Sequence, residues 1–202
     1  MGSVGPAEPE TRPDEVVALV RAWVEEFVVG LALCPFAAEP LAAGRVRFAL
    51  SPARTPEALA DDLADELARL DRTAPEELET TLLLAPHALP RFEDFNAFLD
   101  VVDLLLEKLS LVGVLQVASF HPDYRFAGAA IDDPAHASNR SPVPMLHLLR
   151  EASVARAAAS HPDPRGIPAR NAARLRELGW AGIARVTPRG RPHASARGRS
   201  SG

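Results

Sequence analysis

The pattern of apolar and polar positions along the chain predicts helices that alternate with short strands. After Asp14, apolar residues recur every three or four positions up to Cys34-Pro35, as they do in an amphipathic helix. The same spacing follows Thr55-Pro56, an N-cap with proline in the first turn, and it also follows Pro90. The apolar positions of these three helices are Val16, Val20, Trp23, Val24, Phe27 and Leu31; Leu59, Leu63, Leu67 and Leu70; and Phe92, Phe95, Leu99, Val102, Leu105, Leu106 and Leu109.

Three short apolar segments are predicted strands. Residues 45–50 alternate in polarity, residues 80–85 form a compact apolar run typical of a strand covered on both faces, and residues 114–120 follow Gly113. Helices of this length between strands suit right-handed crossovers, so we expect an α/β fold with a small, mainly parallel sheet of three or four strands. Residues 182–187 are the candidate for an added edge strand. An α+β ferredoxin-like fold is the alternative.

Two further helices are expected toward the C-terminus. Ser141-Pro142 begins the first of them, with Met145, Leu148 and Leu149 on one side and with His147 and Glu151 on the opposite face. The second begins at residues 163–164 and ends at Gly179. Before these helices, residues 121–141 have no convincing period. A segment of that length without secondary structure inside a domain is often functional.

Composition and charge limit the class of protein. With 202 residues, 47% of them hydrophobic and 24% charged, the chain is an ordinary globular protein. We expect a single α/β domain over residues 14–187, a disordered N-terminal tail over residues 1–13 and a disordered basic tail over residues 188–202. Neither a membrane span nor a signal peptide is indicated, and one cysteine fits a reducing compartment, so we expect a cytoplasmic protein.

Charge and motifs exclude several partners. The net charge of −5 combines a more acidic body with a basic C-terminal end, and an acidic body argues against nucleic acid as the partner. The glycine-rich motifs of nucleotide-binding proteins are missing, so no nucleotide cofactor is expected. Nothing in the sequence indicates an oligomeric state.

The residues best suited to chemistry lie between positions 121 and 151. His121 directly follows the third predicted strand, where ligands bind in open parallel sheets, and Asp123 lies beside it. If the aperiodic segment folds back against the polar face of the next helix, His121 and Asp123 meet His147 and Glu151. Such a set suits a divalent metal, with His121, His147 and Glu151 as candidate ligands, or acid/base catalysis without metal. The alternatives are a His121 that bonds a local carbonyl and an ordinary surface pair of His147 with Glu151.

The sequence also contains candidate residues for a substrate-binding site and a candidate nucleophile. Asn139, Arg140 and the backbone of Ser141 precede the predicted helix and suit an anionic small molecule, with Arg125 as a second clamp. Alternatively, Asn139 and Ser141 only close a turn. Cys34 is either a small buried hydrophobe or a nucleophile that pairs with His121 or His147.

Five segments in order resemble one family, called domain of unknown function 1415. The similarity runs from about Asp14 to Trp180 and excludes both tails. The resemblance implies no reaction, substrate or cofactor, and it implies that the chain is a whole member of that family. The five segments are GLALCPFA (30–37), ETTLLLAPHAL (79–89), QVASFHPDYRFAG (116–128), NRSPVPMLHLLRE (139–151) and HPDPRGIPARNAARLRELG (161–179).

The residues together favour an enzyme of the hydrolase or lyase type that acts on a small polar or anionic metabolite. It would use the His/Asp/Glu cluster, with or without a divalent metal. Redox chemistry is disfavoured because no cofactor motif is present. A non-catalytic metal- or ligand-binding module and an interaction protein are the alternatives.

Overall fold

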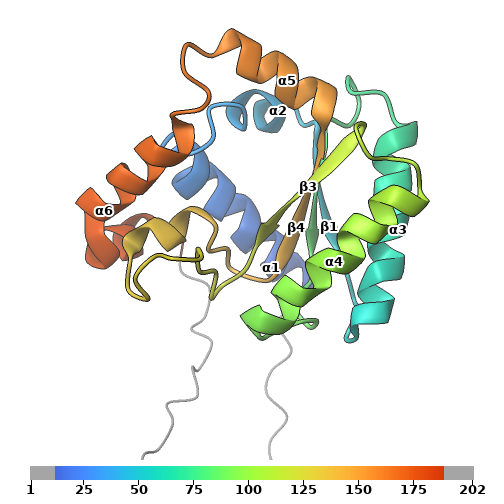
Figure 1. Cartoon of the computed structure of the whole chain (residues 1–202), viewed down its shortest axis with the longest axis horizontal. Helices are drawn as coiled ribbons and strands as arrows, with labels where there is room; N and C mark the ends of the chain where they lie inside the picture. Colours follow the sequence, from blue (N-terminus) through green and yellow to red (C-terminus); the bar gives the residue numbers. More distant parts are fainter. Residues whose placement is uncertain (1–11, 189–202) are drawn as a thin grey trace, which may run out of the picture.

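Residues 12–188 are described by the computed structural model, in which helices lie on both faces of one four-stranded sheet (Figure 1). The expected disordered tails, residues 1–13 and 188–202, lie almost wholly outside the described residues. In chain order the elements are α1 (Pro13–Ala22), which continues directly into the π-helical segment η1 (Trp23–Val29), then α2 (Ala38–Ala42), β1 (Val46–Leu50), α3 (Pro56–Arg72), β2 (Thr80–Leu84), α4 (Phe92–Lys108), β3 (Leu115–Phe120), the short 3-10 helix η2 (Pro134–Ser138), β4 (Met145–Arg150), α5 (Glu151–Ser160) and α6 (Ile167–Val186).

The strand order is β1-β2-β4-β3. Strands β1 and β2 pair in parallel, whereas β4 pairs antiparallel with both β2 and β3. The mixed α/β class is confirmed, but the prediction of a mainly parallel sheet is wrong, because β4 enters between two strands that would otherwise have been parallel neighbours. The element order βαβαββ also differs from the βαββαβ order of the ferredoxin-like alternative.

Strand β4 replaces a predicted helix. The helix expected from Ser141-Pro142 is wrong, because residues 145–150 are extended and helix α5 begins only at Glu151. A short leucine-rich segment with helices over both of its faces has no period that separates a strand from a helix. Pro142 and Pro144 favour extended backbone at the residues before them. The Ser141 hydroxyl donates to Val143 O at 2.6 Å, within the extended segment that leads into β4.

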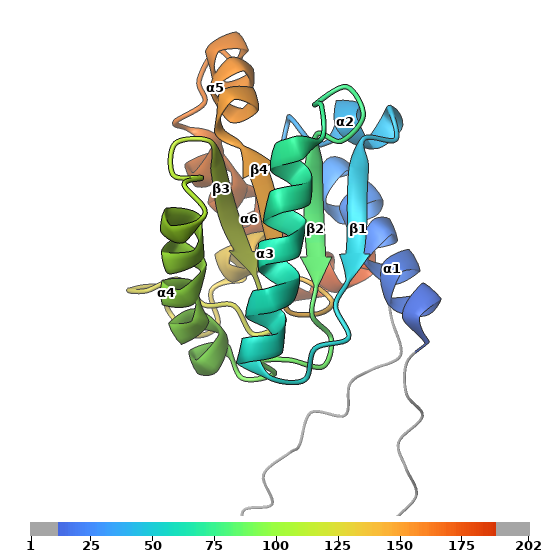
Figure 2. The same cartoon turned by 90° about the vertical axis from the view of Figure 1, so that its right-hand side faces the viewer.

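The two faces of the sheet carry two separate apolar clusters. Helices α3 and α4 cover one face, where they pack on Leu83, Leu146 and Leu148. Helix α1, η1 and α6 lie on the other face, toward Leu82 and Met145 (Figures 1 and 2). Because side chains alternate along a strand, His147 belongs to this second face.

The C-terminal helix differs from its prediction at both ends. Helix α6 runs from Ile167 to Val186 and changes direction at Gly179, whose φ of 61° lies in the left-handed region that glycine tolerates without a steric cost. The edge strand expected at residues 182–187 is therefore wrong, since Gly182 and Ile183 are buried on the helix after this change of direction. No helix in residues 12–188 is long and apolar enough to cross a membrane.

Truncation of a central leucine tests the placement of β4. We expect Leu148→Ala to lower the free energy of unfolding by about 2–5 kcal/mol, because this fully buried side chain leaves a cavity. The matched control is Leu104→Ala on α4, where the leucine is 46% exposed. There the change is expected to stay within about 0.5 kcal/mol. Urea denaturation followed by circular dichroism measures both. Similar losses for the two variants would contradict a buried central β4.

Candidate functional site

A cavity of about 1120 Å³ opens on the sheet face that carries His147. Strands β2, β3 and β4 form its floor, and η1, the loop after it, α5 and α6 contribute the walls. Most of the exposed surface of the lining is apolar, with Trp23, Val28, Phe36 and Phe120 among its members. The lining also includes four arginines and three acids: Arg45, Arg150, Arg156, Arg176, Glu39, Glu79 and Asp133. A hollow with a mainly apolar surface is the usual form of a small-molecule site.

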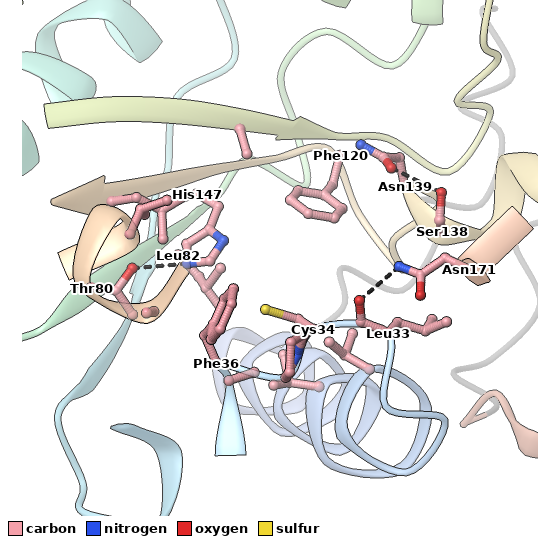
Figure 3. Close-up of a pocket in the computed structure, with 18 of the residues that line it drawn as sticks. Leu33, Cys34, Phe36, Thr80, Leu82, Phe120, Ser138, Asn139, His147 and Asn171 are labelled. Atoms are coloured by element: carbon pink, nitrogen blue, oxygen red, sulfur yellow. Dashed lines mark hydrogen bonds between the residues drawn. The ribbon is translucent and has the colours of Figure 1, made fainter. Parts of the chain in front are cut away.

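His147 projects from β4 into this cavity (Figure 3). Its Nε2 lies 2.8 Å from Thr80 Oγ1, and the same hydroxyl oxygen lies 2.5 Å from Leu148 O. A hydroxyl has one hydrogen and a carbonyl oxygen can only accept, so Thr80 donates to Leu148 O. Thr80 must therefore accept from His147, which places the imidazole hydrogen on Nε2. Nδ1 is left as an acceptor that points away from Thr80 toward the open part of the cavity (Figure 3).

Burial keeps the His147 ring neutral. Loss of hydration lowers its pKa to about 4, because the charged imidazolium is disfavoured among apolar groups. No hydrogen bond to Nδ1 is found in the described part of the chain. At neutral pH the cavity thus contains an uncharged imidazole with a free lone pair.

Cys34 lies in the turn after η1, and its sulfur points into the same cavity (Figure 3). Burial raises the pKa of the thiol, and the backbone amides of Phe36 and Ala37, which face the sulfur, oppose this only in part. The thiol is protonated at neutral pH. Cys34 and His147 share the cavity, but within residues 12–188 no hydrogen bond joins Cys34 to His147 or His121. Asn171 of α6 holds the turn in place by donating to Leu33 O at 2.7 Å.

His121 lies elsewhere and is fully buried. Its Nδ1 accepts the Asp123 amide at 3.0 Å, so Nε2 carries the hydrogen and lies 3.2 Å from Leu89 O. The rings of Phe92 and Phe95 pack against the imidazole, and burial lowers its pKa. Both nitrogens are occupied by backbone groups, in line with the structural alternative that the sequence left open.

The predicted cluster of His121, Asp123, His147 and Glu151 is not brought together. His147 pairs with Ala118 in the middle of the sheet, so His121 lies three residues further along, a distance of roughly 10 Å. Extended chain separates His147 from Glu151 by roughly 13 Å, whereas a helix turn would have brought them within about 6 Å. Among the described residues no three His, Cys, Asp or Glu side chains form a group that could hold a metal ion.

The residues of the predicted substrate-binding site lie in two separate places. Asn139 lines the large cavity, but its amide donates to Ser119 O and its carbonyl accepts from Ser138, so it mainly closes the turn before β4. Arg125 and Arg140 instead line a second, smaller cavity of about 340 Å³ together with Asp123.

Sequence reasoning missed Thr80 and His136. A threonine inside a strand buried on both faces needs a polar partner, and that need was the available signal for Thr80. His136 is fully buried; it accepts the Phe126 amide and contacts Ala130 O at 2.8 Å. It thereby fixes the backbone of the aperiodic segment, a role that no local sequence pattern predicts.

Comparison with known proteins identifies the family but not an activity. The model of a family described as "Protein of unknown function (DUF1415)" matches residues 15–185, which contain both cavities. Neither the curated proteins nor the solved structures contain a match for the chain. The matched segment covers nearly all of the described fold, and the chain therefore belongs to the DUF1415 family of proteins of unknown function.

Proposed function

We propose that this protein binds a small, largely apolar molecule in the large cavity and that His147 accepts a hydrogen bond from it. The observation that carries the proposal is the unpaired Nδ1 of a neutral imidazole inside a mainly apolar hollow. The ligand-binding alternative left open by the sequence thus becomes the first choice. The expectation of a polar or anionic substrate depended on a cluster that is not assembled.

The cavity wall supports an apolar ligand body. Phe36 from the loop, Phe120 from β3 and Trp23 from η1 all line it. Each Å² of apolar surface that a ligand removes from water contributes about 25 cal/mol. A cavity of about 1120 Å³ accommodates a molecule of drug-like size.

The tautomer of His147 supports a ligand with a hydroxyl or N–H group. A neutral Nδ1 can accept a hydrogen bond but cannot donate one, so a carboxylate would place its charge against a lone pair. A hydrogen bond of this kind contributes about 0.5–1.5 kcal/mol of selectivity.

A hydrolase- or lyase-type enzyme is the second candidate. The observation that favours it is the presence of the Cys34 thiol and His147 Nδ1 in one cavity (Figure 3). A thiol activated by an imidazole is the usual arrangement of a cysteine nucleophile. The raised pKa of Cys34 and the lowered pKa of His147 both favour the uncharged pair in the free protein, which is why binding is preferred.

A pair of ligands in which a methyl group replaces the hydroxyl hydrogen tests the binding proposal. We expect 4-propylphenol to bind the protein about 2- to 10-fold more tightly than 4-propylanisole, because only the phenol donates to Nδ1. In His147→Leu this preference should disappear while both ligands still bind. Isothermal titration calorimetry at pH 7 measures the four affinities. A preference that persists in His147→Leu, or no binding to the wild type, contradicts the proposal.

Two alanines on α5 locate the binding site. Ala157 lines the cavity, whereas Ala155 on the same helix is exposed and outside it. We expect Ala157→Phe to weaken binding of both ligands by about tenfold or more, because its ring occupies the space that a ligand needs. Ala155→Phe should leave both affinities unchanged. Equal effects of the two substitutions would place the ligands outside the cavity.

Alkylation of Cys34 separates the two candidates. Cys34 is the chain's one thiol, so uptake of iodoacetamide followed by mass spectrometry reports on it alone. We expect the rate to keep rising above about pH 8.5, the ordinary cysteine value, because burial raises the pKa of this thiol. A rate that is already level between about pH 6 and 8, and that falls in His147→Leu, would indicate a thiolate–imidazolium pair and favour the enzyme.

A further inference from the structure

The second cavity lies at the N-terminal end of α4 and gathers three arginines. Its volume is about 340 Å³, and Arg91, Arg125 and Arg140 line it with two acids, Glu93 and Asp123. The formal charge of this lining is therefore positive, and Asp94, which is outside the lining, pairs with Arg91 at 3.8 Å. This cavity shares no lining residue with the large one, so it is a separate site.

Arg140 is held in place without an ion pair to any of the described residues. Its guanidinium lies 4.6 Å from the centre of the Trp180 ring, and its Nε donates to Tyr124 O at 3.1 Å. Within residues 12–188 no carboxylate lies at ion-pair distance from it. Half-burial lowers the pKa of Arg140, and the charge of the nearby Asp123 carboxylate offsets this only in part, so the guanidinium is partly removed from water without full compensation. An anion from solution would relieve that cost.

The neighbours of Arg140 favour a doubly charged anion. Arg125 is positioned by Glu93 at 2.9 Å, and its guanidinium faces the ring of Phe92. The first residues of the 17-residue helix α4 line this cavity, so the positive end of its dipole lies there, offset in part by Glu93 and Asp94 in the first turn. A guanidinium group can donate two parallel hydrogen bonds to two oxygens of one phosphate. The acids Glu93 and Asp123 reduce the attraction for any anion, but the positive potential that remains attracts a doubly charged phosphate more strongly than a singly charged carboxylate.

We propose that this second cavity binds a small phosphate monoester, with Arg140 as the main phosphate ligand and with Arg91 and Arg125 beside it. Phe92 and the 74%-exposed Ile131 supply an apolar wall for the organic part of such a molecule. Asp123, which forms no ion pair in the described chain, is available to accept a hydrogen bond from a ligand hydroxyl. This site is independent of the proposed apolar ligand.

Three probes at low ionic strength test the assignment: phenyl phosphate, inorganic phosphate and benzoate. We expect calorimetry to show the tightest binding for phenyl phosphate, weaker binding for inorganic phosphate and the weakest for benzoate. Arg140→Gln should weaken binding of phenyl phosphate by about tenfold or more. Arg91→Gln, at a mostly exposed position that should not disturb folding, is expected to weaken it by a smaller factor. Arg156→Gln on α5, outside this cavity, should change nothing.

Several results would overturn the proposal. No binding of phenyl phosphate to the wild type, equal weakening in Arg156→Gln, or tighter binding of benzoate would each do so. Binding that is unchanged in both Arg140→Gln and Arg91→Gln would also reject it. His147→Leu should leave the phosphate affinity unchanged, and Arg140→Gln should leave binding of 4-propylphenol unchanged. Failure at one cavity is therefore distinguishable from failure at the other.

Discussion

The hydroxyl of Thr80 has one hydrogen, and the carbonyl of Leu148 at 2.5 Å takes it. His147 Nε2, at 2.8 Å from the same oxygen, must then donate, and its Nδ1 faces the large cavity as an acceptor. The hydroxyl connects β2 to β4, so the register of these two strands sets the protonation pattern of a side chain in the cavity. Loss of hydration keeps that imidazole uncharged.

The insertion of β4 between β2 and β3 explains both cavities. As a central strand it directs Leu146 and Leu148 toward α3 and α4 and directs Met145 and His147 toward η1 and α6. The long segment before it must return from the end of β3 to the start of β4. That segment is ordered by buried His121 and His136, each of which bridges backbone groups, and its arginines reach the N-terminal end of α4.

The spacing of apolar residues along the sequence was sufficient to predict those helices and strands that turn one face toward the core. It predicted α3 and α4, whose leucines and phenylalanines recur on one side, and β1, whose residues alternate in polarity. Strand β2 was predicted as a compact apolar run and β3 as the apolar segment after Gly113. The spacing of apolar residues failed at residues 145–150, because Met145, Leu148 and Leu149 also fit one side of a helix and a true helix, α5, begins directly afterwards at Glu151. The candidate site depended on that segment. If residues 145–150 formed a helix, His147 would lie beside Glu151. Because they form a strand, His147 bonds to Thr80 and lines the cavity that also contains Cys34.

A measurement of the tautomer and charge of His147 is the most direct test of the hydrogen-bond arrangement around Thr80. Long-range ¹H–¹⁵N correlation spectra of ¹⁵N-histidine-labelled protein distinguish protonated from unprotonated ring nitrogens, and the spectrum of His147→Leu assigns the signal. The hydrogen bonds of Thr80 and the burial of the ring predict that Nε2 carries the hydrogen and Nδ1 does not, from pH 8 down to about pH 4, where the ring becomes charged. A hydrogen on Nδ1 of the neutral ring, or an imidazolium that forms at the ordinary histidine pKa of about 6.5, would contradict it.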